Sequence, residues 1–180
     1  MNIWPPPLHK NVVGSPNGEQ ETAITQLVVL LRVVNLVFGG IYAGFLVAVL
    51  VIELTLRRFD ASVYVQVQQI KHLRLNWLAI ATLTPTLVSG LLLVLLPRPL
   101  KTTVFVLTLM SLLCMAGALV ITLRVNVPIN ADQMTWKVGA PPPNWAAICD
   151  QWQLAHAVRT GLAVVGFCCQ IPAALMAQAT

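Results

Sequence analysis

The chain has 180 residues, of which 57% are hydrophobic and 9% are charged, whereas soluble domains carry about 25% charged residues. This composition excludes an ordinary soluble domain and predicts an integral membrane protein. The net charge of +5 is spread along the segments between apolar runs, so it indicates topology and contact with anionic lipid head groups rather than nucleic-acid binding.

The N-terminal segment is polar and rich in proline, glycine and asparagine. Residues 1–22 contain neither the apolar core nor the small-residue cleavage site of a signal peptide. We therefore expect a flexible polar tail over 1–22 and a single transmembrane domain over 23–180.

Four apolar runs follow, each long enough to cross roughly 30 Å of hydrocarbon as a helix. They cover residues 27–54, 77–96, 104–123 and 154–176. Backbone groups in lipid must be hydrogen-bonded within their own segment, so runs of this length are helices rather than barrel strands. The sequence predicts an all-α membrane protein with an antiparallel four-helix transmembrane bundle.

The first run contains small residues and two polar residues of note. Gly40 and Gly44 form a GxxxG pattern, which lets another helix approach closely, either within the bundle or in a homodimer. Arg32 and Asn35 lie at the other end of this run, and we expect them to snorkel or to pair with a neighbouring helix.

The three connections between the runs differ in character. In the first, Asp60 lies in a segment that offers a break and a new N-cap, so the second helix should begin before the membrane. Pro97 and Pro99 predict a tight turn in the second. The third, residues 124–145, contains Pro128 and three consecutive prolines at 141–143, and it should fold over the bundle end as a lid.

Basic residues are more frequent on the side of the first and third connections. That side carries Arg57, Arg58, Lys71, Arg74, Arg124 and Lys137, and the other side carries Lys10, Arg98 and Lys101. The positive-inside rule then places both termini outside the cytoplasm. The lack of targeting sequences favours a bacterial inner membrane.

Polar side chains gather at one end of the predicted bundle. Trp152, His156 and Arg159 are spaced by four and three residues, so they share one stripe at the start of the fourth helix. Asn126 and Asn130 lie at the end of the third helix, where their amides can be directed into the bundle. Because unpaired polar groups are unfavourable in hydrocarbon, this cluster is the candidate site.

Two more polar residues reach the same end from the other helices. Glu53 lies in the last turns of the first helix, and His72 lies about one turn before the second apolar run. Antiparallel packing brings these ends to the start of the fourth helix. Each has a plainer alternative, because Glu53 can pair with Arg57 four residues later, His72 can lie at the surface, and the asparagines can merely cap the third helix.

Three segments together form a family signature. They are RVNVPIN at 124–130, WQLAHAVRT at 152–160 after a Trp-rich segment, and the glycine-rich GGIYAG at 39–44. In this combination the chain resembles the anthrone oxygenase-like family of small four-span membrane proteins, and in particular its bacterial branch. The resemblance covers about residues 30–178.

The resemblance implies an oxygenase that needs no cofactor or metal and converts a polyketide anthrone to an anthraquinone with molecular oxygen. His156 would act as the base that forms a carbanion or enolate, which donates an electron to oxygen. Arg159, Asn126 and Asn130 would stabilise the oxyanion. The side chains that bind the flat hydroxyaromatic substrate would be Trp152, Trp145, Glu53 and His72.

Other functions stay open at this point. His72, His156 and Glu53 are the ligand types of a non-haem iron site, although no short-range metal motif supports one. A non-catalytic bundle that binds a lipid or quinone, or serves as an accessory subunit, is the main alternative. The four cysteines form no CxxC pair, so we expect them to be buried small hydrophobic residues. A transporter is disfavoured because internal repeats and broken helices are lacking.

Overall fold

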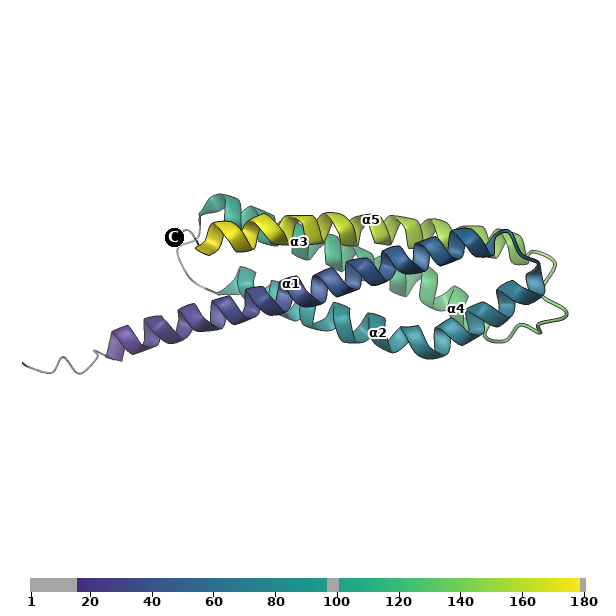
Figure 1. Cartoon of the computed structure of the whole chain (residues 1–180), viewed down its shortest axis with the longest axis horizontal. Coiled ribbons are helices and arrows are strands. Elements are labelled where there is room, and N and C mark those ends of the chain that lie inside the picture. Colours follow the sequence, from purple (N-terminus) through teal and green to yellow (C-terminus); the bar gives the residue numbers. More distant parts are fainter. Residues whose placement is uncertain (1–15, 97–100, 179–180) are drawn as a thin grey trace, which may run out of the picture.

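The structure is a computed structural model that describes residues 16–96 and 101–178. Four helical segments run alongside one another in alternating directions (Figure 1). They are α1 (Pro16–Leu56), α2 (Ala61–Leu95), α3 (Thr102–Ile121), which continues through the π-helix η1 (Thr122–Asn126) into α4 (Val127–Gln133), and α5 (Trp145–Gln178). The predicted all-α four-helix bundle is confirmed.

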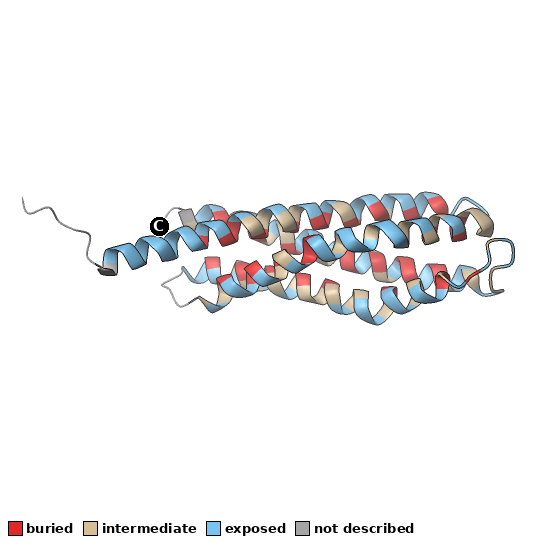
Figure 2. Cartoon of the chain, turned by 90° about the horizontal axis from the view of Figure 1, so that it is seen from below, coloured by how far each residue is buried: buried red, intermediate tan, exposed pale blue. Residues whose placement is uncertain are grey.

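All four segments are long and apolar enough to cross a membrane. Large apolar side chains cover the outside of the bundle, with Leu30 at 59% exposure and Trp77 at 72%. Figure 2 shows buried positions recurring along each helix between exposed ones. An apolar outer surface of this extent is unfavourable in water and suited to lipid, so the chain is an integral membrane protein.

The boundary between tail and bundle differs from the prediction. Helix α1 begins at Pro16, so residues 16–22, which were expected in the flexible tail, are helical. Extending a formed helix is far easier than nucleating one, and Glu19 lies in the first turn, where it interacts favourably with the helix dipole. Residues 1–15 and the predicted turn at Pro97 and Pro99 lie outside the described residues.

The start of α2 agrees with the sequence. Asp60 is the N-cap, and its carboxylate accepts the Val63 backbone N–H at 3.0 Å and the Ser62 hydroxyl at 2.7 Å. The Val63 hydrogen bond, followed by that of Ser62, lowers the pKa of the Asp60 carboxyl. From this cap the helix runs unbroken to Leu95, which is about 52 Å at 1.5 Å per residue and longer than a membrane core.

The third segment does not end where the sequence indicated. The apolar run stops at Leu123, yet the helix continues past Pro128 to Gln133. Pro128 has no N–H to donate, and the chain widens just before it, where the Val127 N–H bonds to the Thr122 carbonyl five residues back. The irregular part of the third connection is therefore confined to residues 134–144.

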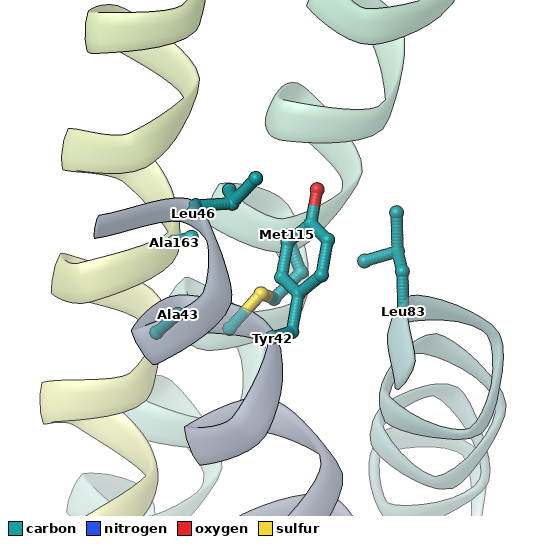
Figure 3. Packing of buried hydrophobic residues seen from close by; sticks show 6 residues of the cluster. All are labelled: Tyr42, Ala43, Leu46, Leu83, Met115 and Ala163. Atoms are coloured by element: carbon teal, nitrogen blue, oxygen red, sulfur yellow. The ribbon is translucent and has the colours of Figure 1, made fainter. Parts of the chain in front are cut away.

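A tightly packed core joins the four helices near the middle of the bundle. Figure 3 shows Tyr42, Ala43 and Leu46 of α1 with Leu83, Met115 and Ala163 from the other helices. These side chains fix the rotation of α1, and with it the direction in which residues one and two turns further along point.

One glycine of the GxxxG pattern in α1 takes part in helix packing within the bundle. A Cβ at Gly40 would lie 3.0 Å from the Phe167 ring of α5, so Gly40 permits close packing within the bundle. Gly44 is exposed and has no atom near its Cβ position. The homodimer through Gly40 and Gly44 stays a prediction, and Gly40 already packs against Phe167 of α5.

Candidate functional site

A cleft lies near the end of the bundle where α1 meets α2 and α4 meets α5. It has about 560 Å³ of free space, including its open mouth. Helix α2 forms one wall, with side chains spaced by three or four residues along one face: Gln68, Lys71, His72, Leu75, Asn76 and Ala79. Thr122, Asn130, Trp152 and Arg159 face them from the third segment and α5.

Trp152 is the centre of this site. Its ring stacks on His156 with 4.9 Å between ring centroids and an interplanar angle of 23°. Lys71 Nζ lies 5.3 Å from the ring centroid, and Arg159 Cζ lies 5.8 Å from it. Its Nε1–H donates to Asn130 Oδ1 at 2.7 Å, which fixes the orientation of the ring. The cleft therefore has a flat aromatic wall with two cations beside it.

The first cation is paired. Lys71 forms an ion pair with Glu53, which is fully buried, and Gln68 Nε2 donates to both carboxylate oxygens of Glu53 at 2.9 and 3.0 Å. The alternative pairing of Glu53 with Arg57 is wrong, because Arg57 pairs with Asp150 at the exposed end of α5. Glu53 points into the bundle because it continues the inward stripe of Leu46 and Val49.

The second cation, Arg159, is bonded only to neutral groups. Its Nε–H donates to His156 Nδ1 at 2.9 Å, and Nη1 donates to Thr122 Oγ1 at 3.0 Å. The Thr122 hydroxyl hydrogen is already donated to the Ala118 carbonyl at 2.7 Å, so this oxygen is free to accept. Within the described residues no carboxylate contacts Arg159, so its charge is not neutralised by an ion pair.

His156 lies behind this cation rather than in the cleft. It is fully buried and is not among the residues that line the cleft. Its Nε2 is 3.1 Å from the Leu46 carbonyl oxygen, which can only accept, so the ring proton is on Nε2 and Nδ1 is the acceptor for Arg159. Both ring nitrogens are occupied, and the role of His156 as a base stays a prediction.

The two asparagines have different surroundings. Asn130 lines the cleft and accepts the Trp152 indole N–H. Asn126 is fully buried, and its Nδ2 donates to the Trp152 backbone carbonyl at 3.1 Å. Asn126 thus joins η1 to α5 from behind the site, and only Asn130 lies where it can meet a ligand.

Of the two remaining predicted residues, His72 and Trp145, one lines the cleft and the other does not. His72 lines the cleft and makes no hydrogen bond to another described residue. Trp145 instead packs on Tyr64 outside the cleft, with 5.8 Å between ring centroids. The sequence placed Trp145 in the substrate site because it lies close to Trp152 in the chain, but a separation of seven residues puts it two helical turns away along α5.

The third connection packs against α2 near the cleft, and its predicted role as a lid over the bundle end stays a prediction. Gln69 of α2 donates to the backbone carbonyls of Gln133 and Trp136, at 3.3 and 2.9 Å. Gln133 in turn donates to the Tyr64 hydroxyl at 3.3 Å, and the Trp136 side chain is buried. These contacts fix the connection against α2, next to the polar wall of the cleft.

The metal-site alternative has no support in the geometry. In the part of the chain that the structure describes, no three histidine, cysteine, aspartate or glutamate side chains lie close enough together to hold a metal ion. Glu53 is instead occupied by Gln68 and Lys71, and His156 by Arg159 and Leu46.

Sequence reasoning missed Lys71, Gln68 and Thr122. Lys71 was counted as a loop cation that reports orientation, although Gln68, Lys71 and Leu75 have the spacing of one helical face. Carrying the periodicity of the second apolar run back through the polar segment would have placed Gln68 and Lys71 on its inner side. Thr122 carries no such signal, because its role depends on the π-turn.

The comparisons with known proteins give one result. The profile of the family described as anthrone oxygenase matches residues 75–169, which is more than half of the chain and includes the cleft-lining parts of α4 and α5. No characterised protein and no solved structure matches the chain.

Proposed function

The chain belongs to the anthrone oxygenase family, and from this membership we propose that it oxidises a flat hydroxyaromatic compound with molecular oxygen in the cleft beside Trp152. The observation that carries the proposal is the charge of the cleft. Glu53 neutralises Lys71, whereas Arg159 faces neutral partners, so the site has one excess positive charge. Such a site favours a singly charged anion.

An anthrone enolate is an anion of this kind. The methylene between the two rings of an anthrone loses a proton to a base, and the charge moves to the ketone oxygen. Held against Trp152, that oxygen would receive N–H donors from Arg159 and Lys71. The cations lower the free energy of the enolate more than that of the neutral ketone, which is the differential stabilisation that catalysis requires.

The remaining steps balance with one molecule of oxygen. The enolate transfers one electron to oxygen, and the carbon radical and superoxide combine to form a C–O bond. Protonation gives a hydroperoxide. Loss of the remaining proton on that carbon, with cleavage of the O–O bond, yields the second carbonyl and water. The protein contributes a base, an anion site and a flat wall, and the electrons come from the substrate.

For the base we assign His72 in place of His156. His72 lines the cleft, and no hydrogen bond from another described residue occupies its ring, so an imidazole nitrogen can face the substrate as a proton acceptor. The His156 ring is enclosed and supplies its lone pair to Arg159. In this scheme His156 is a positioning residue that sets the direction of the guanidinium.

The membrane orientation belongs to the same proposal. Arg57, Arg58, Arg124 and Lys137 are exposed near the cleft end, whereas Lys71 is used in the site and no longer counts as a topological charge. We place this end at the cytoplasmic face of a bacterial inner membrane, with both termini outside. A flat apolar substrate could then pass from the lipid into a cleft close to the interface.

Oxygen consumption by the purified protein with an anthrone is the test. We compare the wild type with Arg159→Met and with Gln26→Leu, an exposed control on α1. Uptake of one oxygen per anthrone, lost in Arg159→Met and kept in the control, supports the proposal. A folded wild-type protein that takes up no oxygen overturns it, and saturable binding of a quinone or lipid without uptake would favour the non-catalytic alternative.

A further inference from the structure

A second polar cavity lies toward the other end of the bundle and shares no lining residue with the cleft. All four spans contribute, including Arg32 and Asn35 of α1, Leu93 of α2, Thr108 of α3 and Gln170 of α5. It has about 220 Å³ of free space, including its opening. None of these side chains takes part in the oxidation proposed above.

Gln170 is the residue that calls for an explanation. It is 4% exposed, and neither Nε2 nor Oε1 has a hydrogen-bond partner among the described residues. A buried primary amide without partners has lost its hydrogen bonds to water and gained none in return, which is unfavourable. Buried polar groups in native proteins are almost always paired, so an amide in this state indicates a missing partner.

The Gln170 amide of α5 lies against Gly39 of α1. A Cβ at Gly39 would lie 2.4 Å from Gln170 Oε1 and 2.8 Å from Nε2, so in this orientation the amide occupies space that a side chain at residue 39 would take. The Gln170 side chain is therefore packed against the backbone of α1. It lines the cavity and is shielded from the lipid-facing surface.

The cavity offers donors and a positive charge. The Arg32 guanidinium is 7% exposed and lines the same space, and it carries five N–H donors. Asn35 is fixed beside it, because its Nδ2 donates to the Thr86 carbonyl at 2.8 Å and to Ser89 Oγ at 3.1 Å. Both Asn35 N–H groups are used in these bonds, so the donors offered to a ligand are those of the guanidinium and the unengaged Gln170 NH₂, a set complementary to the oxygens of a carboxylate or phosphate.

We propose that this cavity binds a small oxyanion, a carboxylate or phosphate group, between Arg32 and Gln170. Thr108 lies six residues from the start of α3 and Gln170 eight residues from the end of α5, so along these two helices the cavity is about 9–12 Å from the helix ends. A lipid head group or a free ion can supply the same chemistry at that depth. The proposal is independent of the oxidation in the cleft.

The test is saturable thermal stabilisation of the purified chain in a neutral detergent. The probes are acetate, inorganic phosphate and decanoate, with decanol and chloride at equal ionic strength as controls. We expect an oxyanion to raise the unfolding temperature where decanol and chloride do not. Stabilisation by acetate or phosphate identifies a free ion, and stabilisation by decanoate alone identifies a group carried on an acyl chain.

Gln170→Leu is the matched variant, since it keeps the side-chain size and removes the amide. Its apparent affinity for the oxyanion should fall about tenfold or more, whereas Gln26→Leu should bind like the wild type. Without ligand, Gln170→Leu should be at least as stable as the wild type, because an unpaired buried group has been removed. Equal affinity in wild type and Gln170→Leu, or no oxyanion effect beyond that of chloride, overturns the proposal.

Discussion

Arg159 and His156 lie one helical turn apart on α5, and the Nε–H of the arginine donates to Nδ1 of the histidine at 2.9 Å. The other ring nitrogen faces the Leu46 carbonyl of α1 at 3.1 Å. The histidine is thereby held as a neutral acceptor between a backbone carbonyl and a guanidinium. Its position determines where the charge of Arg159 meets the cleft.

This relationship predicts different effects of two substitutions at His156. In His156→Gln, a side-chain oxygen can still accept from Arg159, so the variant should fold and keep part of its oxygen uptake. In His156→Ala the Arg159 Nε–H loses its acceptor, which should lower stability by about 1–3 kcal/mol and reduce kcat more than it raises KM. If His156 is instead the base, His156→Gln and His156→Ala should lose oxygen uptake to the same extent.

The converse prediction concerns His72. His72→Gln removes the proposed base from the cleft wall without breaking a hydrogen bond between described residues, so the protein should fold normally. General-base catalysis typically contributes 10²–10⁴-fold, and kcat should fall by about that factor. Steady-state oxygen uptake with an anthrone measures it, and Arg74→Gln, an exposed neighbour on α2, is the control. Unchanged kcat in His72→Gln would move the base elsewhere.

Two substitutions separate the contribution of the Trp152 ring from that of its indole N–H. Trp152→Phe keeps an aromatic face beside Lys71 and Arg159 but loses the donor to Asn130 Oδ1. We expect kcat/KM to fall by up to about tenfold, the equivalent of one hydrogen bond. Trp152→Leu also removes the ring, so the loss should be larger and include weaker substrate binding. Equal activity of the two variants would show that the ring contributes nothing to binding.

The sequence predicted the fold well because the requirement that backbone polar groups be hydrogen-bonded in lipid applies to every membrane-spanning segment. Apolar runs of membrane length must be helical, and Asp60 followed by a polar helical segment is a strong start signal. The stripe of Trp152, His156 and Arg159 was also readable, since it depends only on helical spacing. The sequence could not predict which side chains of different helices meet. Glu53 pairs with Lys71 rather than Arg57 because core packing sets how α1 and α2 are rotated about their axes.

The sequence also failed to predict where the third helix ends, for a different reason. A proline usually ends a helix, so the sequence placed Asn126 and Asn130 at the end of the third helix, with their amides directed into the bundle and helix capping as the alternative. The π-turn before Pro128 accommodates the missing N–H, and the helix continues with Asn126 directed to α5 and Asn130 to the cleft. A local change of helical register of this kind depends on tertiary packing against α5.

The N-cap of α2 predicts a pH effect outside the membrane. The pKa of Asp60 is lowered on folding, chiefly by the Val63 N–H, so the folded state favours the charged carboxylate. Its stabilising contribution is complete well above the ordinary value of 3.8 and is lost as the pH falls below that value through the lowered pKa. Asp60→Asn keeps a capping oxygen but does not titrate. The difference in unfolding temperature between the two proteins should therefore shrink or reverse between pH 7 and pH 3, and a constant difference would contradict the argument.

The buried pair of Glu53 and Lys71 predicts a strong and testable coupling. Glu53→Gln leaves Lys71 as a buried cation near Arg159 without its counter-ion, which should destabilise the bundle by about 3–5 kcal/mol. Lys71→Met leaves the Glu53 carboxylate with Gln68 alone and should also be destabilising. In the double variant neither charge is buried, so its loss should be clearly smaller than the sum of the two single losses. A double-mutant cycle on thermal or denaturant unfolding in detergent measures this coupling. Additive losses would mean that the two charges do not stabilise each other, and the assignment of the excess positive charge to Arg159 would fail with them.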